Sequence, residues 1–177
     1  MATPIGHFLI GAAIGAVFSI GDKTRRSIAL GAVAAMAADL DFIPGLLLGE
    51  PSRFHHAQSH SCAFALLAAL LTMLVARNAR LRWSLLIGLA YASHLALDLL
   101  TFDDSPPQGI PLLWPWSESV FQSPVMLLPN VLHKRSMLLS AHNFGIMARE
   151  VGFLGLLFVG ALLFARRRRG LIQEDLR

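Results

Sequence analysis

The stretch Ala38-Asp39-Leu40-Asp41-Phe42-Ile43-Pro44 places two carboxylates at the end of a long apolar run. Two further polar stretches also adjoin apolar runs, namely His55-His56-Ala57-Gln58-Ser59-His60-Ser61 and His94-Leu95-Ala96-Leu97-Asp98. Removing a charged group from water is costly unless the group is paired or coordinated. The three stretches together therefore predict one metal site that is assembled from several helix ends.

The composition is that of a membrane protein. The chain has 177 residues, which favours one domain, 1–177. Charged residues make up 15% of it and hydrophobic residues 55%, whereas a soluble domain has roughly 25% charged residues. Cys62 is the only cysteine, which excludes an intrachain disulfide and a cysteine-rich metal site. Lys and Arg occur in short groups between apolar runs, so the basic charge indicates membrane topology and we expect no nucleic-acid binding.

The apolar runs predict an all-α fold, a polytopic membrane helical bundle with about five membrane helices. The runs span about 5–20, 28–48, 62–76, 83–102 and 151–165. Several are shorter than the ~20 residues that cross a bilayer, so tilt or longer helices would have to make up the difference. A soluble bundle is disfavoured because the runs have few polar faces. Glycine and alanine in the first two runs predict close helix contact.

The basic groups predict the topology. They lie at 23–26, 77–82 and 166–169, and five crossings would put all three on one side. By the positive-inside rule that side is cytoplasmic, with the N-terminus outside and the C-terminus inside. All seven histidines then fall on the outer side. The outer segment, about 103–149, is rich in proline. Within it we expect 109–121 to form an interfacial loop or a short amphipathic element over the site, and 131–150 to be helical.

His94 and Asp98 are four residues apart, which puts both on one face of a helix. Imidazole with carboxylate suits Zn²⁺, Mn²⁺ or Fe²⁺; a hydrogen-bonded pair joining two helices is the alternative.

Asp39 and Asp41 point about 200° apart on a regular helix. They cannot both face one ion unless the helix is ending, as Pro44 indicates. One Asp could then bridge two ions, and a solvated helix end is the alternative.

The histidine-rich stretch allows two geometries. His56 and His60 form a pair on one face if a helix has already begun. If Ser59 or Ser61 is the N-cap instead, His55 and His56 lie on a loop and either could reach inward. An exposed polar loop is the remaining alternative. His7 follows Thr3-Pro4, which is typical of a helix start, and would add a ligand from a fourth helix.

These motifs, in order, resemble a known family. Thr-Pro-x-x-His, Asp-x-Asp, His-x-x-x-Ser-His-Ser, His-x-x-x-Asp and Gly-x-Pro-Leu-Leu-Trp-Pro follow one another between about residues 1 and 121. The chain resembles bacterial inner-membrane proteins described as metal-dependent hydrolases, one of them also described as LexA-binding. Their third motif usually reads His-Arg-Gly-x-Thr-His-Ser, so His55, His60 and Ser61 match whereas His56, Ala57 and Ser59 depart. The resemblance implies that His55 and His60 are ligands.

The order of motifs is also similar to that of zinc-dependent phospholipase C, although Ile146 stands where a later acidic ligand would follow His142, with Glu150 further on. We therefore expect a hydrolase with one or two divalent ions, zinc first and manganese or iron next. The expected ligands are His7, Asp39, Asp41, His55, His60, His94 and Asp98, the candidate general bases are Asp39, Asp41 and Asp104, and further candidates are His56, Ser61, His142 and Glu150.

The expected reaction uses a metal-activated water at the outer face of the inner membrane. The substrate would be membrane-associated, because the site opens at the level of the lipid headgroups. A phosphoester of a lipid is the first choice, and a lipid ester or amide is the second. The alternatives are a metal-binding sensor, a transporter, and a structural scaffold whose helices are joined by His–Asp pairs. Transport is disfavoured because the ionisable groups gather near one side of the membrane rather than along a path.

Overall fold

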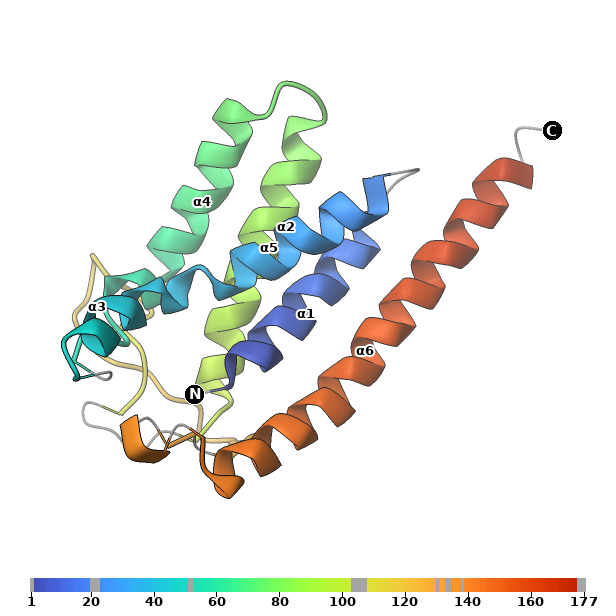
Figure 1. Ribbon diagram of the computed structural model, residues 1–177. Helices are drawn as coiled ribbons and strands as arrows, with labels where there is room; N and C mark the ends of the chain where they lie inside the picture. The colour runs from blue at the N-terminus through green and yellow to red at the C-terminus, as the bar shows by residue number, and fades with distance from the viewer. Residues whose placement is uncertain are drawn as a thin grey trace.

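The computed structural model describes residues 2–19, 23–50, 53–102, 108–129, 131–132, 135–137 and 139–174. Within them the chain is all-α, as predicted. The helices are α1 (Pro4–Val17), α2 (Thr24–Met36), α3 (Phe42–Leu47), α4 (Cys62–Val75), α5 (Arg80–Leu99) and α6 (Ala141–Glu174), with 3-10 turns η2 (Ala38–Asp41), η3 (Gln58–His60) and η4 (Arg135–Met137). Helix α1 packs against α2, α5 and α6, and α4 packs against α5 (Figure 1).

Helices α1 and α2 approach each other through glycines. A Cβ atom at Gly11 would lie 2.4 Å from the carbonyl oxygen of Gly31, and one at Gly15 would lie 2.3 Å from the carbonyl oxygen of Ser27. No real Cβ could occupy either position without moving the backbone of α2. The close helix contact predicted from the small residues is therefore confirmed.

The second apolar run forms a broken helix. Helix α2 ends at Met36, the turn η2 carries Asp39 and Asp41, and α3 follows with a bend of 46°. Pro44 is the third residue of α3, where the missing N–H would have no partner within the helix. The expectation that the helix ends at the two carboxylates is confirmed, but the role given to Pro44 is wrong, because the break falls earlier, next to Ala38, and Ile43 is helical.

The prediction of about five membrane helices is wrong. Among the described residues, α6 is the one helix that is long and apolar enough to cross a bilayer, and the bent pair of α2 with 38–47 would add a second span if it is counted as one. Helices α1 and α4 have 14 residues each, or about 21 Å against a hydrocarbon core of about 30 Å. Helix α5 has 20 residues but begins with Arg80, Leu81 and Arg82 and buries His94 and Asp98.

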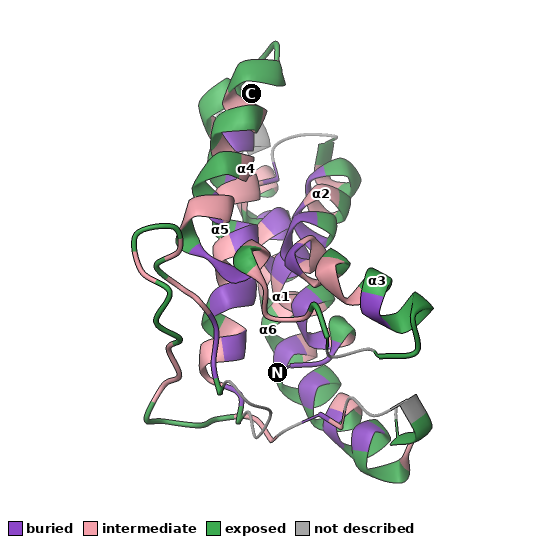
Figure 2. Cartoon of the chain, turned by 90° about the vertical axis from the view of Figure 1, so that its left-hand side faces the viewer, coloured by how far each residue is buried: buried purple, intermediate pink, exposed green. Residues whose placement is uncertain are grey.

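Two helices nevertheless present apolar side chains on their outer surfaces. Most residues of α6 are exposed, and 17% of its most apolar window is buried. Figure 2 shows α4 mostly in the colours of exposed and intermediate residues. On α4, Leu74 and Val75 are 75% and 79% exposed. Contiguous apolar surface of this kind marks contact with lipid or with another protein. The outer faces of α4 and α6 therefore fit a protein that is held in a membrane.

The basic groups at 23–26, 77–82 and 166–169 lie at the opposite end of the bundle from the His/Asp groups (Figure 1). Lys23, Arg26 and Arg77 line one cavity between α2, α4 and α5. Arg168, near the end of α6, donates a hydrogen bond to the carbonyl of Ser19. The basic groups therefore share one end of the bundle, as predicted, although the five crossings on which that prediction rested are absent from the described residues.

The segment 109–121 is irregular, which agrees with the loop of the two alternatives expected, and it contributes to the core. Ile110 is buried and packs with Ala38, Tyr91 and Leu95, which are neighbours of the His/Asp groups in the sequence. The helix expected over 131–150 begins at Ala141, after the short turn η4. Residues 103–107, which include Asp104, lie outside the described residues.

Candidate metal centre

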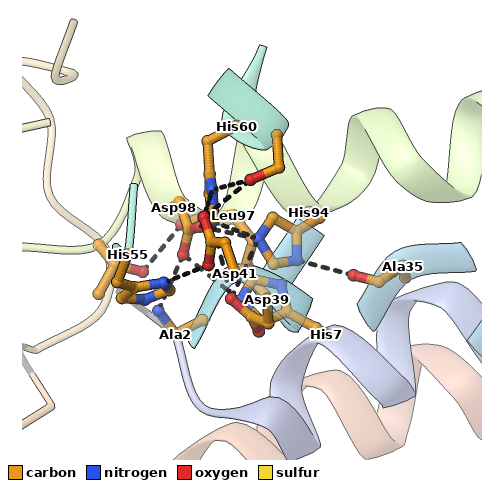
Figure 3. Close-up of polar contacts among 12 residues, drawn as sticks. Ala2, His7, Ala35, Asp39, Asp41, His55, His60, His94, Leu97 and Asp98 are labelled. Atoms are coloured by element: carbon orange, nitrogen blue, oxygen red, sulfur yellow. Dashed lines mark hydrogen bonds and ion pairs between the residues drawn. The ribbon is translucent and has the colours of Figure 1, made fainter. Parts of the chain in front are cut away.

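Five polar side chains from four elements converge at one end of the bundle (Figure 3). They are His7 on α1, Asp39 on η2, His60 on η3, and His94 and Asp98 on α5. All are fully buried or nearly so except Asp39, whose side chain is 17% exposed. Thr3 caps α1 through its side chain and so puts His7 in the first turn of that helix. Side chains that are distant in the sequence therefore meet because four helix ends meet.

Four candidate ligand atoms lie close together at the centre, and five of their six separations are close to those of a tetrahedral metal site. Nε2 of His60 and Nε2 of His94 lie 3.1 Å apart. Asp98 Oδ2 lies 3.1 Å from Nε2 of His94 and 3.6 Å from Nε2 of His60. Asp39 Oδ1 lies 3.5 Å and 3.6 Å from the same two nitrogens. With zinc bonds of about 2.0–2.1 Å, the ligand atoms of a regular tetrahedron are about 3.3–3.4 Å apart.

Hydrogen bonds on the far side of each ring turn the Nε2 atoms inward. His94 donates from Nδ1 to the carbonyl of Ala35 at 2.7 Å. The Nδ1 atom of His60 lies 3.1 Å from Asp41 Oδ2. Asp41 is itself held by His55 Nδ1 at 2.9 Å and by the hydroxyl of Ser59 at 2.7 Å. Such outer contacts fix the tautomer and orientation of metal-binding histidines, so Asp41 lies behind His60 and acts on its ring.

We expect Asp41→Asn to weaken metal binding by about 10- to 100-fold, because the amide no longer fixes the ring of His60 as the carboxylate does. Competition with a chelator of known affinity measures the change. Glu50→Gln is the matched control, since it makes the same replacement at a carboxylate that is 60% exposed and bonded to Arg53. Equal losses in both variants would contradict a positioning role for Asp41.

His7 faces the second oxygen of each central carboxylate. Its Nε2 atom lies 3.4 Å from Asp98 Oδ1 and 4.0 Å from Asp39 Oδ2, and its ring stacks on that of His94 with centroids 3.7 Å apart. Each carboxylate thus directs one oxygen to the pair His60 and His94 and the other to His7. This arrangement suits carboxylates that bridge two ions, one of which His7 would bind.

The centre contains buried polar atoms that make no hydrogen bond within the described part of the chain. They are Asp39 Oδ1, Asp98 Oδ2 and both ring nitrogens of His7. Each such atom costs about 1–3 kcal/mol when it is left unpaired. Three imidazoles and two carboxylates are the donor types that zinc, manganese and iron bind. The residues present therefore fit a metal ion, and the buried His and Asp groups could hold one.

The two histidines that contact Asp41 differ in their pKa values. Burial opposes a charge on His60, but the nearby carboxylates of Asp39 and Asp41 outweigh burial and raise its pKa to about 9. Burial lowers the pKa of His55, despite the hydrogen bond to Asp41. Only neutral imidazole binds a metal. Uptake of a metal at neutral pH would therefore release the proton of His60.

The remaining residues of the histidine-rich stretch surround this centre. His55, His56 and His60 form a second group whose ligand atoms lie within 4.8 Å of one another. His56 has a φ of 62°, and helix α4 begins only after the cap Ser61. The pairing of His56 with His60 on one helix face is therefore absent, and the loop geometry with Ser61 as the cap is the one observed.

The other predicted residues lie at different distances from the centre. Glu150 is buried on α6 and accepts hydrogen bonds from the backbone and hydroxyl of Thr3, so it supports the helix that carries His7. His142 is exposed at the start of α6 and belongs to no group of metal-binding residues in the described chain. Asp104 lies outside the described residues. Ala35 was missed, because a backbone carbonyl leaves no signal in the side-chain pattern.

Comparison with known proteins identifies relatives over almost the whole chain. The family described as YdjM inner membrane protein matches residues 1–170. The inner membrane protein YbcI of Escherichia coli strain K12 is 26% identical over 179 residues, which cover 94% of this chain and 100% of that protein. No solved structure matches the chain. The chain, with its buried His/Asp cluster, therefore belongs to the YdjM inner membrane protein family.

Proposed function

We propose that this protein is a metal-dependent hydrolase of the inner membrane that cleaves a phosphoester of a lipid. The observation that carries the proposal is the convergence of four ligand atoms beside an apolar cavity. His60, His94, Asp39 and Asp98 would hold the first ion, and His7 with the second carboxylate oxygens would hold another. A bound divalent ion of this kind lowers the pKa of a water molecule and polarises a phosphoryl or carbonyl oxygen. Zinc is the first choice for these donors.

The cavity supports a lipid substrate. Its volume is about 530 Å³, and Asp39 and His55 form its boundary with the centre. Most of its other lining residues are apolar, including Leu40, Ile43 and Met147. An apolar wall favours an acyl chain by removing it from water, at about 0.8 kcal/mol per buried CH₂. The headgroup of such a lipid would then lie next to Asp39, which is the most exposed of the five central residues.

The charges on α6 support a site that faces outward. Arg166 to Arg169 follow the apolar part of α6, and the positive-inside rule favours the cytoplasm for that end of a membrane helix. Glu150, near the opposite end of α6, bonds to Thr3 beside His7. The centre would then lie at the outer face, where lipid headgroups are accessible.

Turnover of phosphatidylglycerol in mixed micelles tests the proposal. We expect the wild type, after chelation, to release a phosphate-containing product only when Zn²⁺, Mn²⁺ or Fe²⁺ is added back, and mass spectrometry of both products shows which bond is cut. Asp98→Asn should lose this activity, because it removes a charged ligand from the centre. If the protein holds stoichiometric metal but turns over no lipid phosphoester, ester or amide, the alternative function of a metal-binding sensor is favoured instead.

We further expect Ile43→Asp to raise the KM for long-chain lipids by about tenfold or more, since a charged side chain in the cavity wall removes apolar contact worth about 1.5–3 kcal/mol. The kcat should change little, and a water-soluble short-chain phosphoester should be hydrolysed as before. Leu47→Asp is the matched control on the same helix, because Leu47 is 81% exposed and does not line the cavity. A similar rise in KM for both variants would contradict the assignment of the cavity.

A further inference from the structure

A second cavity lies at the basic end of the bundle, between the start of α2, the end of α4 and the start of α5. Its volume is about 650 Å³. It shares no residue with the groups of the candidate metal centre. Three of its lining residues are cations and several others are apolar, among them Lys23, Arg26, Arg77, Leu71, Val75 and Trp83.

The described residues that line this cavity carry an unbalanced positive charge. Its described lining residues include three cations and no carboxylate. Helices α2 and α5 both begin here, and neither has an acidic residue in its first turn or a side-chain hydrogen bond from its N-cap residue. The N-terminus of a helix carries a partial positive charge, so Arg26 and Arg82 add to a field that is already positive. An anion in the cavity would relieve this repulsion.

The apolar wall shows what kind of anion fits. Leu71 and Val75 line the cavity and are also 52% and 79% exposed on the outer face of α4. The wall therefore continues onto the apolar surface that α4 presents outward. An anion with an acyl chain would contact this apolar wall, whereas a free inorganic anion would not. Trp83 lies beneath Arg26, whose guanidinium carbon is 5.4 Å from the centre of the ring. Aromatic rings of this kind favour the boundary between membrane and water.

We propose that this cavity binds one anionic phospholipid of the membrane. Lys23, Arg26 and Arg77 contact its phosphate, and its acyl chain lies along Leu71 and Val75. The position of α6 supports a lipid, because Arg168 near the end of this apolar helix bonds to Ser19, in the segment that leads towards α2. The cavity therefore lies at the depth where the apolar part of α6 gives way to its basic end, which is the depth of the headgroups.

Native mass spectrometry of the full chain, released from nanodiscs of equal parts phosphatidylglycerol and phosphatidylethanolamine, tests this site. We expect the wild-type chain to retain one phosphatidylglycerol in this cavity, in addition to any molecule held in the cavity beside the metal centre. Lys23→Gln with Arg77→Gln should weaken its retention roughly 30-fold, since each cation near anionic lipid contributes about a factor of five. Ala76→Trp, which fills the cavity without changing charge, should remove this one retained molecule. Both variants should keep the circular dichroism spectrum and metal content of the wild type, because the metal centre lies at the other end.

The matched control is Arg166→Gln with Arg167→Gln, which removes two cations that are exposed near the end of α6 and do not line the cavity. It should retain phosphatidylglycerol within about twofold of the wild type. Equal losses in the two charge variants would overturn the proposal, as would retention of phosphatidylethanolamine in the same amount. Displacement of the lipid by millimolar inorganic phosphate would show a site for free anions and would overturn the lipid assignment.

Discussion

His94→Ala is expected to lose the bound metal. Its Nε2 atom is one of the four converging ligand atoms and lies within 3.6 Å of each of the other three. The purified variant should hold less than about a tenth of an equivalent, where the wild type holds one or two. Hydrolysis of the lipid phosphoester should fall by a factor on the order of 1,000. Elemental analysis and product release measure the two effects separately.

His142→Ala is the matched control for this prediction. It removes the same side chain from an exposed position at the start of α6 and should keep both metal and activity. His94→Asn, which retains a polar side chain in the site, distinguishes loss of a ligand from loss of the fold. Wild-type metal content with wild-type activity in both His94 variants would exclude the proposed centre. Wild-type metal content with abolished activity would exclude His94 as a ligand and place it in catalysis.

Gly11→Ala is expected to have the largest effect on stability. The added Cβ would lie 2.4 Å from the carbonyl oxygen of Gly31 and 2.5 Å from the Cβ of Ala35. Neither contact can be relieved by a flexible side chain, so α1 and α2 must move apart. Overpacking of this kind costs about 3 kcal/mol, which lowers the Tm of a chain of this length by about 6–12 °C. The carbonyl of Ala35 orients His94, so metal affinity should fall as well.

Gly152→Ala on α6 provides the control for Gly11→Ala. A Cβ at Gly152 would meet no atom within 4 Å, and alanine favours a helix over glycine by about 1 kcal/mol. Its Tm, followed by circular dichroism in detergent, should be unchanged or slightly higher. An unchanged Tm for Gly11→Ala would show that α1 and α2 are not in the close contact observed here.

The helical elements followed from the apolar runs, but the number of membrane spans did not. The run at 62–76 corresponds closely to α4, and Thr3-Pro4 marks the start of α1. Mean apolarity shows that a segment avoids water, yet both a bilayer and the interior of a bundle meet that requirement. Helix length and the buried polar face of α5 decide between them. Neither can be read from the composition of a run.

The site was predictable where its chemistry depends on local spacing. The separation of His94 from Asp98 by one helical turn follows from their positions, and their side chains lie 3.1 Å apart. The divergence of Asp39 and Asp41 also follows from helical geometry. Asp39 contacts the central nitrogens, while Asp41 contacts the outer nitrogens of His55 and His60. Which of the two would face the ion depends on how η2 lies against η3, and no local pattern encodes that.

By itself, the sequence determined that apolar helices would carry a set of imidazoles and carboxylates, because such groups in apolar runs must be paired or coordinated. It also determined that basic residues would gather apart from that set, because they occur between different apolar runs. The tertiary structure decided which atoms converge, since the spacing of Nε2 and Oδ atoms depends on the contact between α1 and α2 and on the carbonyl of Ala35. Long-range packing sets distances to a fraction of an ångström, and a metal site requires that accuracy.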